Sequence, residues 1–323
     1  MHAPSPSPAA APARRLFAEP GVVVRGWYVA AASAEIKAGR VMPVDLGSHR
    51  LALWRDQAGR PHAVDARCPH LGADLCQGRV TSAGLRCAFH HWVFDGAGRC
   101  VAAPGFVEPP DRQSPSLPVA ERFGLVWVWA GPIAHCDPPA FPPEDDERRY
   151  LRLTAPPQRL ACHPHLVVAN GLDTAHFEAL HEMRYERPPT VERTGPHQLS
   201  VTLAGRPRSP WLSLLAGTGR RPLSAHFTAL GPAAAWSTVE SPISFHTLYT
   251  ARPLPDGGAL TRVVLFLPKR WGLALPRALL LMALLLHRDR QVLERLRFHR
   301  GFTRQDEALA RFAEWVDGME TFP

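Results

Sequence analysis

The feature that most constrains the fold of this chain is a set of four residues that can bind metal: Cys68, His70, Cys87 and His90. They form two short pairs, Cys-x-His and Cys-x-x-His, and sixteen residues separate His70 from Cys87. Two thiolates and two neutral imidazoles can bind one metal ion or one iron–sulfur cluster. A fold that uses all four must bring two loops to the same place.

The order of residue types within the two pairs discriminates between two kinds of metal site. Zinc accepts two Cys and two His, but zinc-finger spacing usually places a Cys pair first and a His pair second. A Rieske [2Fe-2S] centre takes two Cys on one iron and two His on the other. Since each pair here supplies one ligand of each kind, the pattern favours a Rieske cluster, with a structural zinc site as the alternative.

The segment around the two pairs resembles the Rieske domain of ring-hydroxylating oxygenases. The resemblance extends to residues that follow the second pair: Trp92, Phe94, Asp95 and Gly96. The family usually has Gly directly after the second His, whereas this chain has His91, which either crowds the cluster or faces solvent. The respiratory type of Rieske protein adds a disulfide-forming Cys pair, and this chain has Ala73 and Phe89 at those positions. The resemblance therefore implies the oxygenase type.

A second candidate metal site lies further along the chain, at His176 and His181. At a spacing of five residues, the two side chains would be offset by about 140° around an ideal α-helix. Both can bind one metal only if the helix breaks or bulges locally, a distortion that often marks a functional site. By themselves the two histidines are a weak signal, because ordinary helices also contain them.

Beside the first motif, this segment resembles the mononuclear-iron motif of Rieske oxygenases, D-x-x-H-x-x-x-x-H, with Asp173 in the first position. Asn170 matches an Asn that precedes the motif in part of that family. Two His and one carboxylate form the facial triad of non-haem Fe(II) oxygenases. The family takes its carboxylate from a late helix, in a pattern resembling D-x-x-[VIL]-x-E, which implies Asp289 as the third ligand. Glu294 and Glu178 are the alternatives.

The resemblance implies that Asp173 bridges the two metal sites rather than binding iron. Its carboxylate would accept one hydrogen bond from His176 and another from His90 of a neighbouring subunit, and a carboxylate that orients a ligating His is common. In the family, the two metals of one subunit lie too far apart for fast electron transfer. Head-to-tail trimers, whose contacts close after three copies, bring them together. We therefore expect a C₃ homotrimer.

The sequence divides into four parts. We expect a disordered tail at 1–19, an all-β Rieske domain at 20–135, a proline-rich, solvated linker at 136–149 and a catalytic domain at 150–323. The second part contains short branched or aromatic runs bounded by Gly and Pro, which are typical of strands. These parts predict an α+β protein.

Helices and strands mix in the predicted catalytic domain. We expect helices at 167–182, 277–298 and 304–317, and strands near 199–203, 224–230, 244–251 and 261–267. In the last helix, Leu309, Phe312 and Val316 recur at helical spacing and are expected core residues. An antiparallel sheet wrapped around long helices follows, and the family resemblance implies a helix-grip-like fold.

Composition argues against several partners and locations. The net charge of +8 comes almost entirely from Arg, and no basic stripe with interleaved aromatics indicates nucleic acid. The most apolar run, 278–286, is shorter than the about 20 residues of a membrane span, so we expect no membrane association. The four cysteines outside the ligand pairs follow no disulfide framework, which indicates a reducing cytoplasm.

Together these features predict the terminal oxygenase component of a Rieske system, similar to the branch of ketosteroid hydroxylases and sterol desaturases. A ferredoxin or flavin-dependent reductase would pass electrons from NAD(P)H to the [2Fe-2S] cluster, and a mononuclear Fe(II) would use O₂ to mono-oxygenate a small lipophilic substrate. Demethylation and desaturation stay open, and a Rieske electron carrier or redox sensor is the alternative from another class. Residues that either line a substrate pocket or form sheet core are Trp211, Leu212, Leu214, Leu215, Phe227, Trp236, Phe245 and Tyr249.

Overall fold

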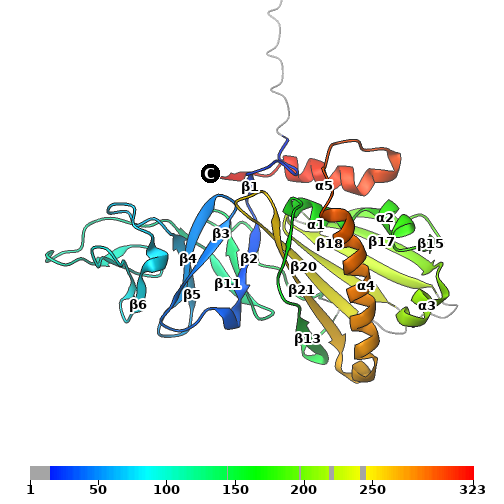
Figure 1. Cartoon of the computed structure of the whole chain (residues 1–323), viewed down its shortest axis with the longest axis horizontal. Coiled ribbons are helices and arrows are strands. Elements are labelled where there is room, and N and C mark those ends of the chain that lie inside the picture. The colour runs from blue at the N-terminus through cyan, green and yellow to red at the C-terminus, as the bar shows by residue number, and fades with distance from the viewer. Residues whose placement is uncertain (1–14, 144, 196–197, 218–221, 241–244) are drawn as a thin grey trace, which may run out of the picture.

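The structure, a computed structural model, describes residues 15–143, 145–195, 198–217, 222–240 and 245–323. Two β-rich halves lie side by side along the longest axis of the molecule (Figure 1). The N-terminal half consists of small antiparallel sheets, and the C-terminal half consists of one large antiparallel sheet covered by helices. The expected α+β class is confirmed.

The N-terminal half packs three antiparallel sheets around two small cores. Its strands are β2 (Trp27–Ala32), β3 (Val41–Leu46), β4 (His49–Arg55), β5 (Pro61–Asp65), β6 (Arg79–Thr81), β7 (Gly84–Arg86), β8 (Val93–Phe94), β9 (Cys100–Ala102), β10 (Ser116–Leu117), β11 (Val119–Arg122) and β12 (Leu125–Trp129). All five residues of β12 are buried and are branched or aromatic, which suits a strand enclosed on both faces. The loop from β5 to β6 carries the first predicted ligand pair, and the turn between β7 and β8 carries the second.

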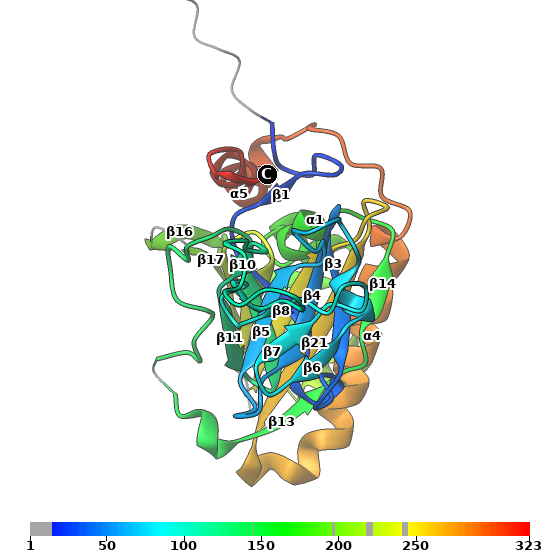
Figure 2. The same cartoon turned by 90° about the vertical axis from the view of Figure 1, so that its left-hand side faces the viewer.

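The C-terminal half is a nine-stranded antiparallel sheet with a long helix along one side (Figure 2). Its strands are β13 (Tyr150–Thr154), β14 (Gln158–Leu160), β15 (Met183–Tyr185), β16 (Thr190–Gly195), β17 (Gln198–Pro207), β18 (Leu223–Leu230), β19 (Ala234–Glu240), β20 (Phe245–Pro253) and β21 (Ala259–Pro268). The long helix, α4 (Leu275–Leu293), buries Met282 in one cluster with Phe245 and Leu267 of the sheet. The short α3 (Pro210–Ala216) packs beside α4.

All four predicted strands of this half are present. Those expected near 199–203, 224–230 and 261–267 lie within β17, β18 and β21, and the one at 244–251 corresponds to β20. Residue 244 itself lies outside the described residues.

The helix predicted at 167–182 is wrong as a single element. The chain forms two short helices, α1 (Pro164–Asn170) and α2 (Thr174–Ala179), with a turn between them. Asp173 is the cause, because its carboxylate accepts hydrogen bonds from two backbone N–H groups of the next turn, one of them that of His176. A side chain that satisfies these donors starts a new helix instead of continuing the old one.

The last helix lies over the C-terminal half, whereas the C-terminus lies beside β1 at the junction of the two halves (Figure 1). α5 (Glu307–Asp317) confirms most of the helix predicted at 304–317, whereas the helix predicted at 277–298 ends earlier, with α4. The short strands β1 (Val23–Val24) and β22 (Thr321–Phe322) pair, and so connect the C-terminus to the start of the N-terminal half.

The predicted disordered tail, 1–19, is too long. Residues 1–14 lie outside the described residues, but Leu16 and Phe17 are buried in the largest core of the protein, with Ala18 packed against it. Phe17 packs edge-on against Phe312 of α5, and its backbone N–H donates to the Asp317 carboxylate. Burying a Phe side chain stabilises a fold by about 1.5–3 kcal/mol, which offsets part of the entropy cost of ordering this segment.

An aromatic core joins the two halves. Trp127 of β12 packs in one cluster with Trp236 and Phe266 of the large sheet. Phe141, which lies in the predicted linker at 136–149, contacts both of these sheet residues. The prediction of a solvated linker is therefore wrong at Phe141, because this side chain is partly buried and packs against the junction.

Candidate metal centres and substrate cavity

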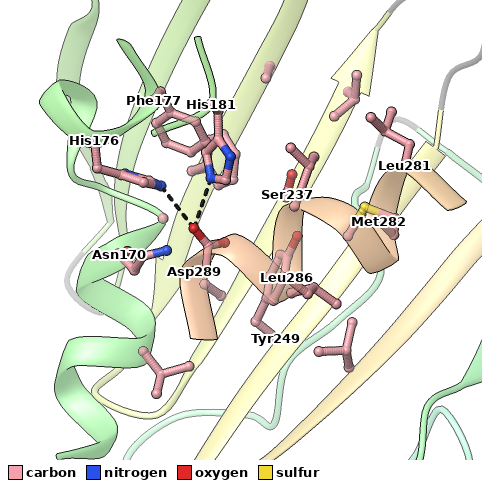
Figure 3. A pocket seen from close by; sticks show the side chains of 18 of the residues that line it. Asn170, His176, Phe177, His181, Ser237, Tyr249, Leu281, Met282, Leu286 and Asp289 are labelled. Carbon is pink, nitrogen blue, oxygen red and sulfur yellow. Dashed lines mark ion pairs between the residues drawn. The ribbon is translucent and has the colours of Figure 1, made fainter. Parts of the chain in front are cut away.

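Three side chains that the sequence predicts as iron ligands meet beside α4. His176 lies on α2, His181 lies two residues after its end, and Asp289 lies near the end of α4. One ligand atom of each lies within 4.8 Å of the other two. Asp289 Oδ1 is 2.8 Å from His181 Nε2 and 3.6 Å from His176 Nε2, and Figure 3 shows both imidazoles pointing at this carboxylate. Such a group can hold one divalent metal ion and leave positions open.

The break that the spacing of the two histidines requires is present. α2 ends at Ala179, so His181 lies outside the helix. Glu182, the next residue, has a φ of +56°, which turns the chain sharply. The two imidazole rings consequently lie close together and nearly perpendicular, with ring centroids 4.9 Å apart.

The buried atoms of these side chains fit a metal ion. His176 Nδ1 lies 2.6 Å from the backbone carbonyl oxygen of Asp173, so Nδ1–H donates there and Nε2 remains as the ligand atom. His176 Nε2 and Asp289 Oδ1 are buried without a hydrogen bond of ordinary geometry to any described residue, and buried polar atoms need a partner. Burial opposes ionisation of Asp289, but the two imidazoles outweigh it and lower the pKa to about 2. An ionised carboxylate and two imidazoles are the donor set that Fe(II) takes.

The two alternative carboxylates lie elsewhere. Glu178 forms an ion pair with Arg208, and Glu294 forms one with Arg290. All four side chains are substantially exposed, and neither glutamate belongs to the ligand group. The structure therefore brings Asp289 to the imidazoles and leaves its two rivals on the surface.

Asp173 contacts His176 differently from what the resemblance implies. Its Oδ1 caps α2, and the imidazole of His176 donates to its backbone carbonyl, not to its carboxylate. The predicted carboxylate–imidazole hydrogen bond is therefore wrong within the subunit, because the capping geometry turns the carboxylate toward the backbone N–H groups of the helix. Asp173 Oδ2 accepts no hydrogen bond from the described residues.

The ligand group lies at the wall of a cavity of about 190 Å³ between the large sheet and α4 (Figure 3). Most of its lining is apolar and includes Phe245 and Met282. Tyr249 and Ser237 add hydroxyl groups to this lining. Burial and the nearby Asp289 raise the pKa of Tyr249 well above its usual range, so its hydroxyl stays protonated at neutral pH.

Half of the residues predicted as pocket or sheet core line this cavity. They are Leu212, Phe227, Phe245 and Tyr249. The other four, Trp211, Leu214, Leu215 and Trp236, do not line it. Trp236 belongs to the junction between the halves, and Trp211 is half-exposed on α3. Ser237 also lines the cavity, and the sequence does not point to it, since a lone Ser in a strand is no signal of a binding site.

The first predicted ligand set also comes together, as two pairs. Cys68 and Cys87 are buried with their thiols in contact, and the ring centroids of His70 and His90 are 4.6 Å apart. Across the described chain, no three of these four ligand atoms lie within 4.8 Å of one another. A tetrahedral zinc site requires all four to converge on one point, so the geometry does not support it. One thiol pair and one imidazole pair fit a cluster of two irons.

The surroundings of this site resolve the question of His91. Its side chain is exposed, so it faces solvent. Its φ is +60°, in the left-handed region that Gly adopts without strain, which explains why Gly is usual in the resembling family. All six cysteines are free, so no disulfide lies beside the site.

Comparison with known proteins identifies the N-terminal half. Residues 26–118 match the family model described as the Rieske [2Fe-2S] domain. This chain contains a Rieske domain. Its cofactor is therefore a [2Fe-2S] cluster, and the predicted Rieske domain is confirmed for this half.

The curated relatives of this Rieske protein include named oxygenases. It is 41% identical to aminopyrrolnitrin oxygenase PrnD of Pseudomonas fluorescens, over 32% of this chain and 31% of that protein. It is 33% identical to 4beta-methylsterol monooxygenase of Methylococcus capsulatus, over 55% and 49% of the two chains. The toluene-4-sulfonate monooxygenase iron-sulfur subunit TsaM1 of Comamonas testosteroni is also 33% identical, over 54% of each chain. The chain thus spans about half or less of the length of these relatives.

Solved structures extend the likeness to the whole fold. Dicamba monooxygenase bound to 3,6 dichlorosalicylic acid has a TM-score of 0.70 at 22% identity, over 90% of this chain and 95% of that chain. NdmB of Pseudomonas putida CBB5 has a TM-score of 0.72 at 20% identity, over 93% of both chains. The Rieske half and the helix-covered sheet are therefore arranged as in Rieske oxygenases. Among the described residues, no helix combines the length and apolar character that crossing a membrane requires.

Proposed function

We propose that this Rieske protein is the terminal oxygenase component of a multicomponent system and mono-oxygenates a small lipophilic substrate. The observation that carries the proposal is the meeting of His176, His181 and Asp289 at the wall of an apolar cavity. An electron carrier or redox sensor needs the cluster but neither the ligand triad nor the cavity. Fe(II) held by these three residues would supply the activation of O₂ next to a substrate C–H bond.

Neighbouring groups fix the orientation and the charge of the three ligand side chains and hold the substrate beside them. The backbone carbonyl of Asp173 fixes the tautomer and ring orientation of His176, so that Nε2 faces the metal position. Asp289 stays ionised, because its pKa of about 2 lies far below neutral pH. The apolar walls exclude water and hold the substrate beside the triad, which lowers the entropic part of the reaction barrier.

We assign the cluster ligands as Cys68 and Cys87 on one iron and His70 and His90 on the other. The backbone N–H groups of His70 and Leu71 point at the Cys68 sulfur, and such hydrogen bonds adjust the reduction potential of a cluster. Cys68 and Cys87 are both buried, which protects the thiolate side of the cluster from solvent.

The two metal sites are far apart within one subunit. Figure 1 places the loops around β6, which carry the cluster ligands, at one end of the molecule and α2 in the other half. We infer a head-to-tail C₃ homotrimer, in which Asp173 accepts a hydrogen bond from His90 of the neighbouring subunit. The Oδ2 atom of Asp173, which has no partner among the described residues, supports this contact. Light scattering that reports a monomer would contradict it.

We also propose the electron donor, the cellular location and the type of reaction. A ferredoxin or flavin-dependent reductase delivers the electrons of NAD(P)H to the cluster. The free state of all six cysteines suits a reducing cytoplasm. Hydroxylation is the reaction we favour, with demethylation and desaturation as alternatives on the same iron.

Iron and sulfide analysis of anaerobically purified protein tests the proposal. We expect three irons and two acid-labile sulfides per chain, with one iron lost in His181→Ala. The matched control is His299→Ala, which changes an exposed histidine. Two irons in the wild type, unchanged in His181→Ala, would indicate an electron carrier.

A further inference from the structure

The wall of the substrate cavity is mostly apolar and contains a small cluster of hydroxyl-bearing side chains. Tyr249 and Ser237 both line the cavity, and Figure 3 shows their oxygen atoms in the same part of it, beside Leu286 of α4. The Thr247 hydroxyl also lies beside that of Tyr249. We call Tyr249, Ser237 and Thr247 the hydroxyl cluster; Tyr249 and Ser237 line the cavity, whereas Thr247 contacts Tyr249 without lining it.

Strand register explains why these three meet. Ser237 of β19 and Thr247 of β20 are directly paired, and Tyr249 lies two residues further along β20, on the same face of the sheet. Ser237 and Thr247 are 2% and 0% exposed. Thr247 Oγ1 has no hydrogen bond of ordinary geometry within the described part of the chain. A buried cluster of hydroxyls that can still form hydrogen bonds suits a polar atom of a ligand.

Apart from the metal position, the described lining of the cavity offers no unpaired cation to an anionic substrate. Of the described residues that line it, Arg290 is the one with a permanent positive charge, and its guanidinium donates to Glu294 at 2.6 Å. Fe(II) and the Asp289 carboxylate would together carry a net positive charge, at the end of the cavity where the reaction takes place. Burying a carboxylate against Tyr249 and Ser237, where no cation lines the cavity, is costly, so this part of the cavity favours a neutral polar group.

We infer that the substrate is a neutral lipophilic molecule with one hydrogen-bonding oxygen, a ketone or a hydroxyl, and that Tyr249 with Ser237 binds this oxygen. The inference rests on the proposed function for its reaction but not for its binding. Tyr249 donates to the oxygen, while the apolar body contacts residues such as Phe245 and Met282. Because the polar end is fixed on the sheet, these contacts decide which carbon lies beside the triad, and Tyr249 is a specificity-determining residue.

Calorimetry with three probes of one carbon skeleton tests the inference on the iron-loaded protein without O₂. The probes are 2-tetralone, a neutral ketone; tetralin, which lacks the oxygen; and 1,2,3,4-tetrahydro-2-naphthoate, an anion. We expect 2-tetralone to bind about 3- to 10-fold more tightly than tetralin, the gain of one net hydrogen bond. We expect the anion to bind more weakly than tetralin.

Variants distinguish the contribution of the Tyr249 hydroxyl to binding from that of the cavity's shape. Tyr249→Phe should remove the preference for 2-tetralone and leave the affinity for tetralin unchanged. Tyr28→Phe is the matched control, since Tyr28 is buried in the N-terminal half and donates to the Val24 carbonyl. It should keep the preference. Thermal unfolding shows whether each variant is folded.

Three results would overturn the inference: equal affinity for 2-tetralone and tetralin, a preference for the anion, or a preference that persists in Tyr249→Phe. Absence of binding by all three probes would also overturn it. Ser237→Ala is a second test if Tyr249→Phe does not fold. We expect it to lower the preference for 2-tetralone over tetralin by less than Tyr249→Phe does. Iron content, measured on the same samples, reports separately on the proposed function.

Discussion

Replacing Asp173 by Asn separates its structural role from its proposed role in electron transfer. Asp173 Oδ1 accepts two backbone hydrogen bonds at the start of α2, of 3.0 and 3.1 Å. Asn caps a helix about as well as Asp does, whereas Ala at a cap costs about 1 kcal/mol. The carbonyl that orients His176 belongs to the backbone and is kept in both variants. We therefore expect Asp173→Asn to retain iron and wild-type stability, and Asp173→Ala to lose about 1 kcal/mol.

The rate of electron transfer should respond to the lost charge. In the proposed trimer, Asp173 makes a charge-assisted hydrogen bond to the neighbouring cluster ligand, and such bonds are worth about 1.5–3 kcal/mol. If the whole of this interaction is present when the electron moves, Asp173→Asn lowers the rate about 10- to 150-fold. Stopped-flow absorbance after mixing the reduced cluster with O₂ measures this rate as reoxidation of the cluster.

Asp146→Asn is the matched control for this experiment. Asp146 also caps a short helical turn, through the backbone N–H of Arg148, but it lies in the segment between the halves. We expect it to leave the reoxidation rate unchanged. Asp173→Asn with full iron and a wild-type rate would refute the bridging role. Loss of iron in Asp173→Asn would place its effect at the metal site instead.

Three further predictions concern stability. Phe17→Ala should lower the free energy of unfolding by about 3–5 kcal/mol in urea titrations, because Phe17 is buried in the main core. An unchanged free energy of unfolding would show that Phe17 does not pack in this core. Burial lowers the pKa of His163 to about 4, below its unfolded value of 6.5, so the unfolded chain binds a proton first. Stability should therefore be full above pH 6.5 and fall by about 3 kcal/mol toward pH 4, and His163→Asn should reduce this fall. His91→Gly should remove the strain of a left-handed backbone and change the free energy of unfolding by less than about 1 kcal/mol. Because the His91 side chain faces solvent, the visible spectrum of the cluster should stay unchanged; a changed spectrum would contradict this position.

The cluster site could be predicted from sequence because its chemistry is local. Each ligand pair lies within four residues, so the residue types and their order already favour two irons over zinc. The same holds for His176 and His181, whose spacing requires the helix break that the structure contains. By contrast, helical periodicity does not place the end of α1, because capping by Asp173 competes with helix continuation through hydrogen bonds that no periodicity displays.

Residue types and short spacings thus determined the metals this protein can hold, since ligand chemistry depends on which atoms a few neighbouring residues offer. Packing decided the rest. Asp289 reaches the two imidazoles only because α4 lies across the large sheet, and Tyr249 joins Ser237 only through the register of β19 and β20. Phe17 is buried only because helices from the far end of the chain cover it. These contacts join segments distant in sequence, and their free energy comes from excluding water between surfaces that only the complete fold brings together.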